Sequence, residues 1–599
     1  MRIYEDLRIV QSRLAVLQAV AVVLVASLVV QFWTLQVIRA RHFRELAENN
    51  RSRLVTLAAP RGALLDRDGH LLVGNRPSFN VVLNPEHSDD LDRVVARLST
   101  ALGMGEATIR ERLARRQPYR PVVVKTDASL ADVAALEARR RELPEVSIEV
   151  VPLRSYPLAS AAAHALGRVG EITERQLQLD EFRGLAPGSL VGQAGLESRY
   201  NKDLMGHDGY RRVIVNSHGL EVQEADRQAP EDGPSLTLSI DASLQAAMEK
   251  AFAGRAGSGV ALDPRTGEIL AMTSTPAYDP NEFTTGIDAA AWASLATDPE
   301  TPLMNRVIQG TYSPGSTFKI IASTAALEEG VITPSTTFYC PGYLAVYNTV
   351  FHCSNPHGHG VMDLRRAIAN SCNVYFYQVG IRLEIARLAK WAKLMGLGAP
   401  TGVDLPHEVT GLMPSPEWKM RVFKTPWYAG ETVSVAIGQG QVSATPLQMA
   451  RVAAVVANGG RLVRPHLVRG AEDSLPLGIH PETIAAVKEG MRAVVAEGTG
   501  WRARLSTVDV CGKTGSAQVV AKARLEKSPN ATEFLPHGWF LAFAPADDPR
   551  IVLAVIVEHG RSGGESAAPV ARQILAHYFG VDQPTAPGTA GVADTEAED

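Results

Sequence analysis

The chain has 599 residues, of which 45% are hydrophobic and 21% charged, and its formal net charge at pH 7 is -4. A chain of this length is expected to form two or three domains, and its charge offers no broad basic field of the kind that binds nucleic acid. Four cysteines in a chain of this size also exclude a scaffold built on disulfides.

Residues 14–36 are almost wholly apolar and carry no charge. A helix of this length rises about 33 Å, enough to cross a bilayer core. A cleaved signal peptide is the alternative, but its apolar region is usually about 7–15 residues long and precedes a small-residue cleavage site. Residues 36–41 offer no such site, so we expect an uncleaved transmembrane anchor. Arginines lie on both sides of it, and the positive-inside rule therefore does not give its orientation.

Residues 40–234 predict an extended, non-catalytic α+β region. Short strand-like runs alternate with helical stretches rich in Ala, Arg and Glu; the strands are expected at 79–83, 122–125 and 147–151, and the helices at 91–102 and 130–141. Such a region could hold a domain away from a membrane, or its many charges could simply be a solvated surface.

Residues 235–580 predict a second α+β domain. Strands are expected near both of its ends and helices between them, which indicates one antiparallel sheet covered by helices. The expected strands are 236–240, 259–262, 268–274, 508–520, 538–543 and 551–558, and the expected helices include 242–252, 364–369 and 567–578. Residues 581–599 contain Pro, Gly, Ala, Thr and acidic residues but no Lys or Arg, which is typical of a disordered tail.

Three short polar motifs lie in this second domain. The first is Ser316 and Lys319, placed three residues apart where a helix is expected to begin after Gly315, so that both side chains share one face. A serine becomes a nucleophile when a base takes its proton, and a lysine can be that base if burial or a nearby cation lowers its pKa. The other two motifs are Ser371-Cys372-Asn373 and Lys513-Thr514-Gly515-Ser516. Taken alone, the first motif would indicate a capped surface helix, the second the junction of a helix and a loop, and the third a bend in a strand.

Ser-x-x-Lys, Ser-x-Asn and Lys-Thr-Gly, in this order, are the signature of penicillin-recognising serine acyl transferases. Outside the motifs, Arg61-Gly62, Gly195-Leu196-Glu197 and Asp263-Pro264 resemble the class B penicillin-binding proteins, as do the anchor and the pedestal-like region 40–234. Pro426-Trp427-Tyr428 and Gly438-Gln439-Gly440 resemble the elongation-specific branch of that family, the penicillin-binding protein 2 group. The resemblance covers nearly the whole chain before about residue 580.

The resemblance implies a peptidoglycan D,D-transpeptidase that is inhibited by β-lactams. Ser316 would attack the penultimate D-Ala carbonyl of a stem peptide, with Lys319 as its base, and the acyl-enzyme would then be attacked by an amine of a second stem. Implied roles for the other motif residues are proton relay by Ser371, substrate-amide binding by Asn373, carboxylate binding by Lys513 and Thr514, close approach of the substrate at Gly515, and an oxyanion hole from the backbone N–H groups of Ser316 and Ser516.

A cluster of possible metal ligands lies beside the second motif: Cys340, Cys353, His359 and Cys372. Three thiolates and an imidazole suit tetrahedral structural zinc, and the resemblance supports zinc because some penicillin-binding protein 2 members carry it in this region. A Cys340–Cys353 disulfide is the alternative in an exported domain, and His357 could replace His359. Cys511 is expected to be a buried strand residue.

The same resemblance implies a single-pass protein of the cytoplasmic membrane, with residues 1–13 in the cytoplasm and the catalytic domain in the periplasm. It also implies a partner, a rod-shape glycan polymerase of the SEDS family, alongside the elongation complex. Two alternatives stay open at the level of sequence: a division-specific class B transpeptidase, and a non-catalytic β-lactam sensor. A sensor would need further membrane spans and a cytoplasmic effector, and the sequence shows neither.

Overall fold

The computed structural model describes residues 7–41, 52–88, 90–114, 121–185, 187–215, 221–470, 473–518 and 532–581. Most of the tail predicted at 581–599 and part of the predicted N-terminal segment 1–13 lie outside these residues. The chain forms two compact units. Unit 1 comprises residues 1–60, 77–152 and 206–232, and unit 2 comprises residues 61–76, 153–205 and 233–599.

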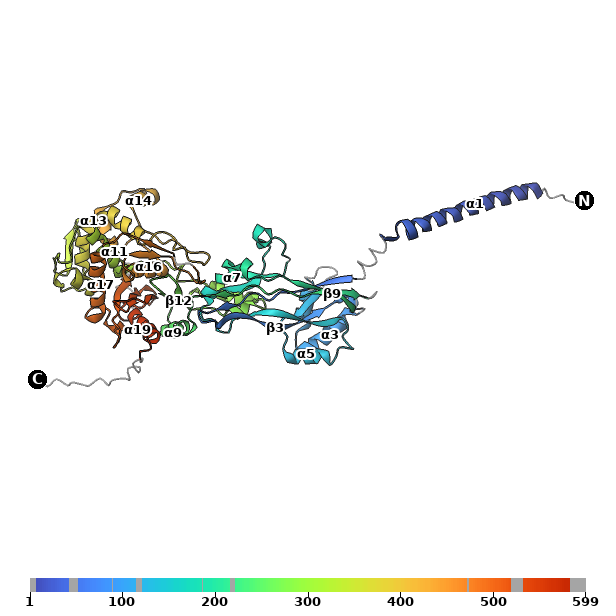
Figure 1. Cartoon of the computed structure of the whole chain (residues 1–599), viewed down its shortest axis with the longest axis horizontal. Coiled ribbons are helices and arrows are strands. Elements are labelled where there is room, and N and C mark those ends of the chain that lie inside the picture. Colours follow the sequence, from blue (N-terminus) through green and yellow to red (C-terminus); the bar gives the residue numbers. More distant parts are fainter. Residues whose placement is uncertain are drawn as a thin grey trace, which may run out of the picture. The chain divides into compact units, whose positions relative to one another are not determined.

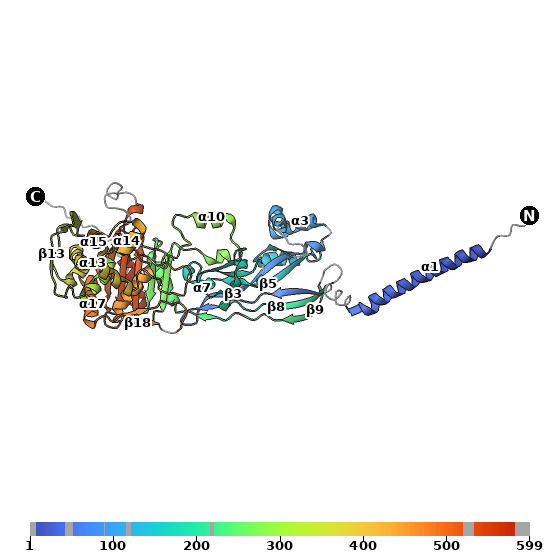
Figure 2. The same ribbon diagram turned by 90° about the horizontal axis from the view of Figure 1, so that it is seen from above.

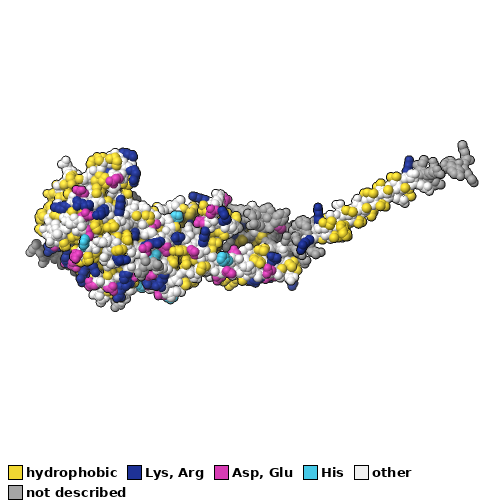
Figure 3. Space-filling view, turned by 45° about the horizontal axis from the view of Figure 1, so that its top comes forward, with side chains coloured by type: hydrophobic (Ala, Val, Ile, Leu, Met, Phe, Trp, Pro, Cys, Tyr) yellow, Lys and Arg dark blue, Asp and Glu magenta, His cyan; other side chains and the backbone are white. Residues whose placement is uncertain are grey.

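The apolar N-terminal segment forms helix α1 (Leu7–Trp33), which continues into a short π-helix, η1 (Thr34–Ile38). Within Gln11–Ile38, the most apolar stretch of 18 residues has a mean hydropathy of 2.4, and hydrophobic side chains cover the helix along its length (Figure 3). The helix is therefore long and apolar enough to cross a membrane, as the uncharged run at 14–36 predicts.

The rest of unit 1 contains two sheet regions. Three antiparallel strands pair in the order β1-β8-β9, with β8 and β9 side by side in Figure 2; their bounds are Ser52–Leu57, Gly209–Val215 and Glu221–Gln228. The second half of β3 (Leu71–Leu83) pairs with β4 (Val122–Lys125), and β5 (Val146–Ser155) also pairs with β3. Three helices complete a small apolar core here: α3 (Leu91–Leu102), α4 (Glu106–Ala114) and α5 (Leu130–Glu137).

Unit 2 is organised around a five-stranded antiparallel sheet in the order β12-β11-β21-β20-β19. The strands are β11 (Gly257–Leu262), β12 (Ile269–Thr275), β19 (Cys511–Ala517), β20 (His537–Ala544) and β21 (Ile551–Val557). Side chains of successive strand residues point to opposite faces, and in β20 Leu541 joins one apolar core while Ala542 joins another. Both faces are thus buried, which explains the continuous apolar runs of β20 and β21. β19 lies at the edge of the sheet.

Helices cover both faces of this sheet. On one face lie α9 (Ala242–Phe252) and α19 (Ala567–Tyr578). The core on the other face includes α11 (Lys319–Glu328), α13 (Asn373–Leu394), α16 (Pro446–Ala457) and α17 (Pro481–Ala496), which gather in one part of Figure 1. The predicted α+β class is confirmed, and an antiparallel sheet whose strands come from distant parts of the sequence is indeed flanked by helices.

Several predicted elements match the structure to the residue, among them α9, α19, β4 and α12 (Leu364–Ala369). The strand predicted at 508–520 is wrong in length, because β19 begins at Cys511 and ends at Ala517. Of the residues predicted to precede Cys511 in this strand, Val508 lies in a bend, and 509–510 form no regular structure.

Candidate active site

Ser316 lies in a one-turn 3-10 helix, η6 (Gly315–Phe318), immediately before α11. Two glycines bring the backbone around it into close contact. Gly315 has φ +55°, its N–H donates to Gly438 O at 2.9 Å, and a Cβ there would lie 2.6 Å from Ser516 O. Gly438 has φ +70°, and a Cβ there would lie 2.1 Å from Gly315 O. Because neither position tolerates a side chain, η6 packs directly against β19 and the 438 loop.

Lys319, one turn after Ser316, is fully buried. Its Nζ donates to Ser371 O at 2.8 Å and to Asn373 Oδ1 at 2.7 Å, and lies 3.2 Å from Ser371 Oγ. Burial lowers the pKa of Lys319 to about 7, although the nearby thiols of Cys372 and Cys353 act in the opposite direction. Lys319 therefore needs little free energy to lose its proton near neutral pH.

Lys513 approaches the same hydroxyl from β19. Its Nζ donates to Ser371 Oγ at 3.0 Å and to Thr514 O at 2.9 Å, and the side chain is fully buried. Burial first, and the charge of Lys319 second, hold the pKa of Lys513 well below its ordinary value. Ser371 itself adopts φ +53° in the short turn between α12 and α13, which directs its hydroxyl between the two amines.

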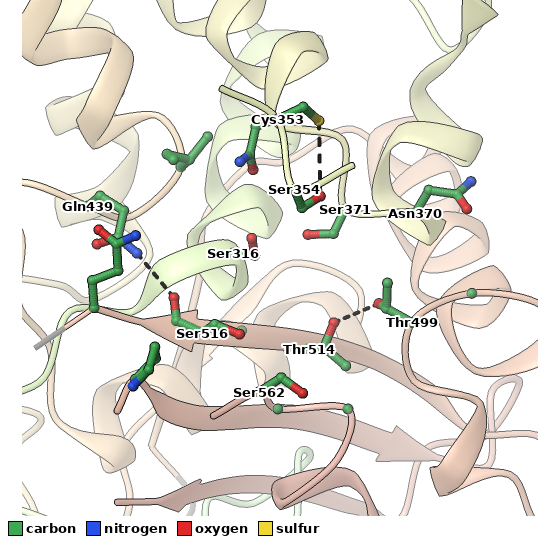
Figure 4. A pocket seen from close by; sticks show the side chains of 18 of the residues that line it. Ser316, Cys353, Ser354, Asn370, Ser371, Gln439, Thr499, Thr514, Ser516 and Ser562 are labelled. Carbon is green, nitrogen blue, oxygen red and sulfur yellow. Dashed lines mark hydrogen bonds between the residues drawn. The ribbon is translucent and has the colours of Figure 1, made fainter. Parts of the chain in front are cut away.

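These residues face a cleft of about 1010 Å³. The side chains or backbone of Ser316, Ser371, Asn373, Thr514, Gly515 and Ser516 line it, whereas Lys319 and Lys513 lie beneath its surface. Figure 4 shows Ser316 between Ser371 on one side and Ser516 and Thr514 on the other. The structure thus brings together all three motifs, which are up to 200 residues apart in the sequence.

Other lining residues lie outside the three motifs. Thr499 Oγ1 lies 2.6 Å from Thr514 Oγ1, and Gln439 Nε2 donates to Ser516 O at 3.1 Å. Glu497, Trp501, Arg502 and Glu565 also line the cleft. They come from loops and helix ends whose position depends on the packing of α17, β19 and α19, so no local pattern in the sequence reveals them.

The predicted cysteine cluster forms next to Ser371. Cys340 ends β13 (Phe338–Cys340), Cys353 follows β15 (Thr349–His352), His359 precedes β16 (Gly360–Met362), and Cys372 precedes α13. Their Sγ and Nδ1 atoms all lie within 4.8 Å of one another, with His359 Nδ1 3.4 Å from Cys353 Sγ and 3.7 Å from Cys340 Sγ.

All four cysteines are free thiols, so the alternative Cys340–Cys353 disulfide is not formed. His359, rather than His357, joins the set. A hydrogen bond with Cys372 and backbone N–H groups lower the pKa of Cys353, which favours a thiolate in the cluster. The four side chains could hold a metal ion.

Comparison with known proteins gives one consistent family. Residues 257–576 match the penicillin binding protein transpeptidase domain, and residues 56–238 match the penicillin-binding protein dimerisation domain. The chain is 35% identical to the peptidoglycan D,D-transpeptidase MrdA of Acinetobacter baumannii, over 96% of this chain and 89% of that protein.

Two solved structures are similar over most of their length. One is the penicillin-binding protein PBP2 of Helicobacter pylori in complex with MreC, with a TM-score of 0.79 and 29% identity over 88% of this chain and 99% of that one. The other belongs to a peptidoglycan synthase complex that coordinates polymerization and crosslinking, with a TM-score of 0.73 and 32% identity over 96% of this chain and 99% of that one.

Proposed function

The chain belongs to the class B penicillin-binding proteins, in the group of PBP2 and MrdA, and on this premise we propose that Ser316 is the nucleophile of its reaction. The chain is an elongation-specific peptidoglycan D,D-transpeptidase. The donor is a stem peptide that ends in D-Ala-D-Ala. Ser316 Oγ attacks the penultimate carbonyl, a C–O bond forms, and the C–N bond to the terminal D-Ala breaks.

The hydrogen bonds of Lys319 carry this proposal. A neutral amine has two N–H groups and one lone pair. Ser371 O and Asn373 Oδ1 can only accept, so they use both N–H groups. The lone pair remains to accept a proton, and on this proposal that proton comes from Ser316. The pKa of about 7 makes the neutral form available. Lys319 is therefore the general base for acylation.

Ser371 relays the proton to the leaving amine. Its hydroxyl accepts from Lys513 and lies within hydrogen-bond reach of Lys319, so a proton can pass from one amine through Ser371 Oγ to the nitrogen of the departing D-Ala. Lys513 and Thr514 bind the terminal carboxylate, and Asn373 binds the substrate amide. The backbone N–H groups of Ser316 and Ser516 stabilise the oxyanion.

The acyl-enzyme is resolved by an amine of a second stem peptide. The amine nitrogen forms a C–N bond to the acyl carbon, the C–O bond to Ser316 breaks, and one amine proton returns to Ser316 Oγ. β-Lactams resemble D-Ala-D-Ala, and their reaction with Ser316 stops at the acyl-enzyme.

Covalent labelling with a fluorescent penicillin tests the assignment. We expect the wild type to be labelled and Ser316→Ala to lose the label completely, because the ester cannot form. Ser434→Ala, which removes another hydroxyl lining the same cleft, is the matched control and should keep the label. Labelling that persists in Ser316→Ala would refute the proposal.

We further propose that the cysteine cluster holds a structural zinc ion. Zn–S and Zn–N bonds of about 2.3 and 2.0 Å in a tetrahedron separate neighbouring sulfur and nitrogen ligands by about 3.5 Å. The distances of 3.4 and 3.7 Å from His359 Nδ1 agree with this spacing. When bound, the ion would tie the loop at Cys340 and Cys353 to Cys372, and so fix the turn that carries Ser371.

Elemental analysis of the purified chain tests the metal. We expect one zinc per chain in the wild type and its loss in Cys372→Ala, whereas Cys511→Ala, a buried cysteine outside the cluster, should retain it. Zinc well below one per wild-type chain contradicts the proposal.

The remaining parts of the proposal concern cellular context. Helix α1 serves as a single-pass anchor in the cytoplasmic membrane, with residues 1–13 inside, a pedestal at 40–234 and the transpeptidase at 235–580 in the periplasm. Similar chains occur with MreC and within a peptidoglycan synthase complex, which supports assembly of this chain with the elongation complex and a SEDS-family glycan polymerase.

A further inference from the structure

The cleft extends well beyond the residues assigned above, in two directions from Ser316. In Figure 4, Gln439 and Ser516 lie towards one end, and Thr499 and Asn370 towards the other. We call the second end the η7 end, because it includes part of the 3-10 helix η7 (Trp501–Ala503). Its lining residues beyond Thr514 are Asn370, Glu497, Thr499, Trp501, Arg502 and Glu565.

The proposed function determines which end the donor peptide fills. Its terminal carboxylate lies at Thr514 and its reacting carbonyl at the N–H of Ser516. Thr514 and Ser516 are two residues apart in the edge strand β19, a separation of about 6.6 Å. The line from the carboxylate at Thr514 to the carbonyl at Ser516 therefore gives the direction of the donor peptide along β19. The donor stem continues in that direction, past Ser516 towards Gln518. The donor therefore leaves the η7 end free, apart from the departing D-Ala.

The acceptor amine must approach from the side that the D-Ala amine leaves. Aminolysis of the acyl-enzyme by D-Ala is the reverse of acylation, so any incoming amine follows the path of the leaving amine past Ser371 and Thr514. The rest of the acceptor peptide then extends over the η7 end.

The charges at the η7 end fit such a peptide. Glu497 is paired with Arg365, their nearest atoms 2.5 Å apart. Arg502 is exposed, its guanidinium carbon lies 5.1 Å from the Trp501 ring centroid, and the described part of the chain gives it no acidic partner. Glu565, also exposed, brings the opposite charge to the same end. A guanidinium beside an aromatic face suits a peptide carboxylate, and opposite charges together suit a zwitterionic peptide.

We propose that the η7 end is the acceptor subsite and that Arg502 binds a carboxylate of the acceptor stem. This carboxylate is remote from the attacking amine and is not attached to the carbon that bears it. Arg502 is a specificity-determining residue for the second half of the reaction and plays no part in acylation. This inference rests on the proposed role of Ser316.

The test separates the two half-reactions in the full-length chain. An N-acyl-D-alanyl thioester serves as donor and acylates the enzyme without an acceptor. Stem peptides with one free amine serve as acceptors, either as free acids or with the carboxylates remote from the amine converted to amides. The measured quantity is the ratio of aminolysis to hydrolysis of the acyl-enzyme.

For the wild type, we expect amidation of the acceptor to lower this ratio about tenfold, the value of one charge-assisted hydrogen bond. Arg502→Gln should lower the ratio about tenfold for the free acid and leave the amide unchanged, with Arg502→Lys between the two. Arg504→Gln, an exposed arginine two residues away that does not line the cleft, should behave as the wild type.

Three results overturn the inference: an unchanged ratio in Arg502→Gln, an equal fall for both acceptors, or a wild-type enzyme indifferent to amidation. Penicillin labelling of Arg502→Gln at the wild-type rate shows that the variant is folded and acylates normally. A failure of the Ser316 assignment is distinct, because it would appear as thioester turnover that persists in Ser316→Ala.

Discussion

The buried amines of Lys319 and Lys513 both contact the hydroxyl of Ser371. Two ammonium groups around Ser371 Oγ repel each other, and burial removes the water that would screen them, so protonation of one disfavours protonation of the other. Lys513 needs a charge to bind a carboxylate, yet its pKa is well below the ordinary value in the free enzyme. The arriving substrate carboxylate supplies the negative charge that raises this pKa again, so Lys513 becomes charged when the donor binds.

The pH dependence of acylation follows from Lys319. Its pKa is lowered to about 7, so below that pH the amine is protonated and cannot take the Ser316 proton, whereas above it the base is free. We expect the second-order rate constant for penicillin acylation to rise about tenfold per pH unit below pH 7 and to level off above it. Stopped-flow measurements between pH 5.5 and 9 check this. A profile that is flat through pH 7, or one that still rises steeply at pH 9, contradicts it.

The chemistry of these residues was predictable because each motif is local in sequence. Ser316 and Lys319 share one helical turn, and Lys513 to Ser516 share one strand. The fully buried state of both lysines was not predictable, because it depends on α13, α11 and β19 packing over them. The sequence does not indicate that Arg502 and Glu565 line the cleft, since only the tertiary fold brings η7 and the loop before α19 together there.

At the scale of elements, the position of Ser316 depends on backbone contact between η6 and the 438 loop. The sequence shows Gly315 and Gly438 but not that they touch. The sequence alone also does not predict the order of the strands, because β19 joins the sheet only through pairing with β20. The lengths of α9, α12 and α19 were predictable, since each has a helical pattern that ends at a clear boundary.

Gly438→Ala tests this contact. The new Cβ would lie 2.1 Å from Gly315 O at φ +70°, so η6 must move away from the 438 loop. A displacement of about 1 Å can cost about 100-fold in rate, and we expect a loss of that order in penicillin acylation. The same substitution at Gly430 in α15 (Ala429–Val435) is the control, because its Cβ would meet only Phe351 Cζ at 3.8 Å. Equal acylation rates for both variants would show that the close contact does not position Ser316.

At the scale of the whole molecule, the two compact units divide the chain at places that the sequence did not indicate. Segments 61–76 and 153–205, predicted to be part of the pedestal, pack in the unit that contains the active site. One buried ion cluster joins these segments: Glu197 accepts from Arg61 Nε and from Arg154 Nε, each at 2.6 Å, and all three side chains are at least nine-tenths buried. Arg154 also donates to Asn75 Oδ1 at 3.4 Å. The three residues are far apart in sequence, so their contact could not be read from any local pattern.

Glu197→Gln therefore affects the unit that carries Ser316. The substitution keeps the shape of the side chain but leaves two buried guanidinium ions without a counter-charge, which costs about 3–5 kcal/mol. We expect the temperature at which half of the penicillin-labelling capacity is lost to fall by several degrees. Glu221→Gln is the matched control in the other unit; it breaks a half-exposed pair with Arg211 worth at most about 1 kcal/mol and should leave heat inactivation unchanged. If Glu197→Gln also left heat inactivation unchanged, these segments would not contribute to the stability of the active-site unit, and the division of the chain at residue 234 would describe its folding better.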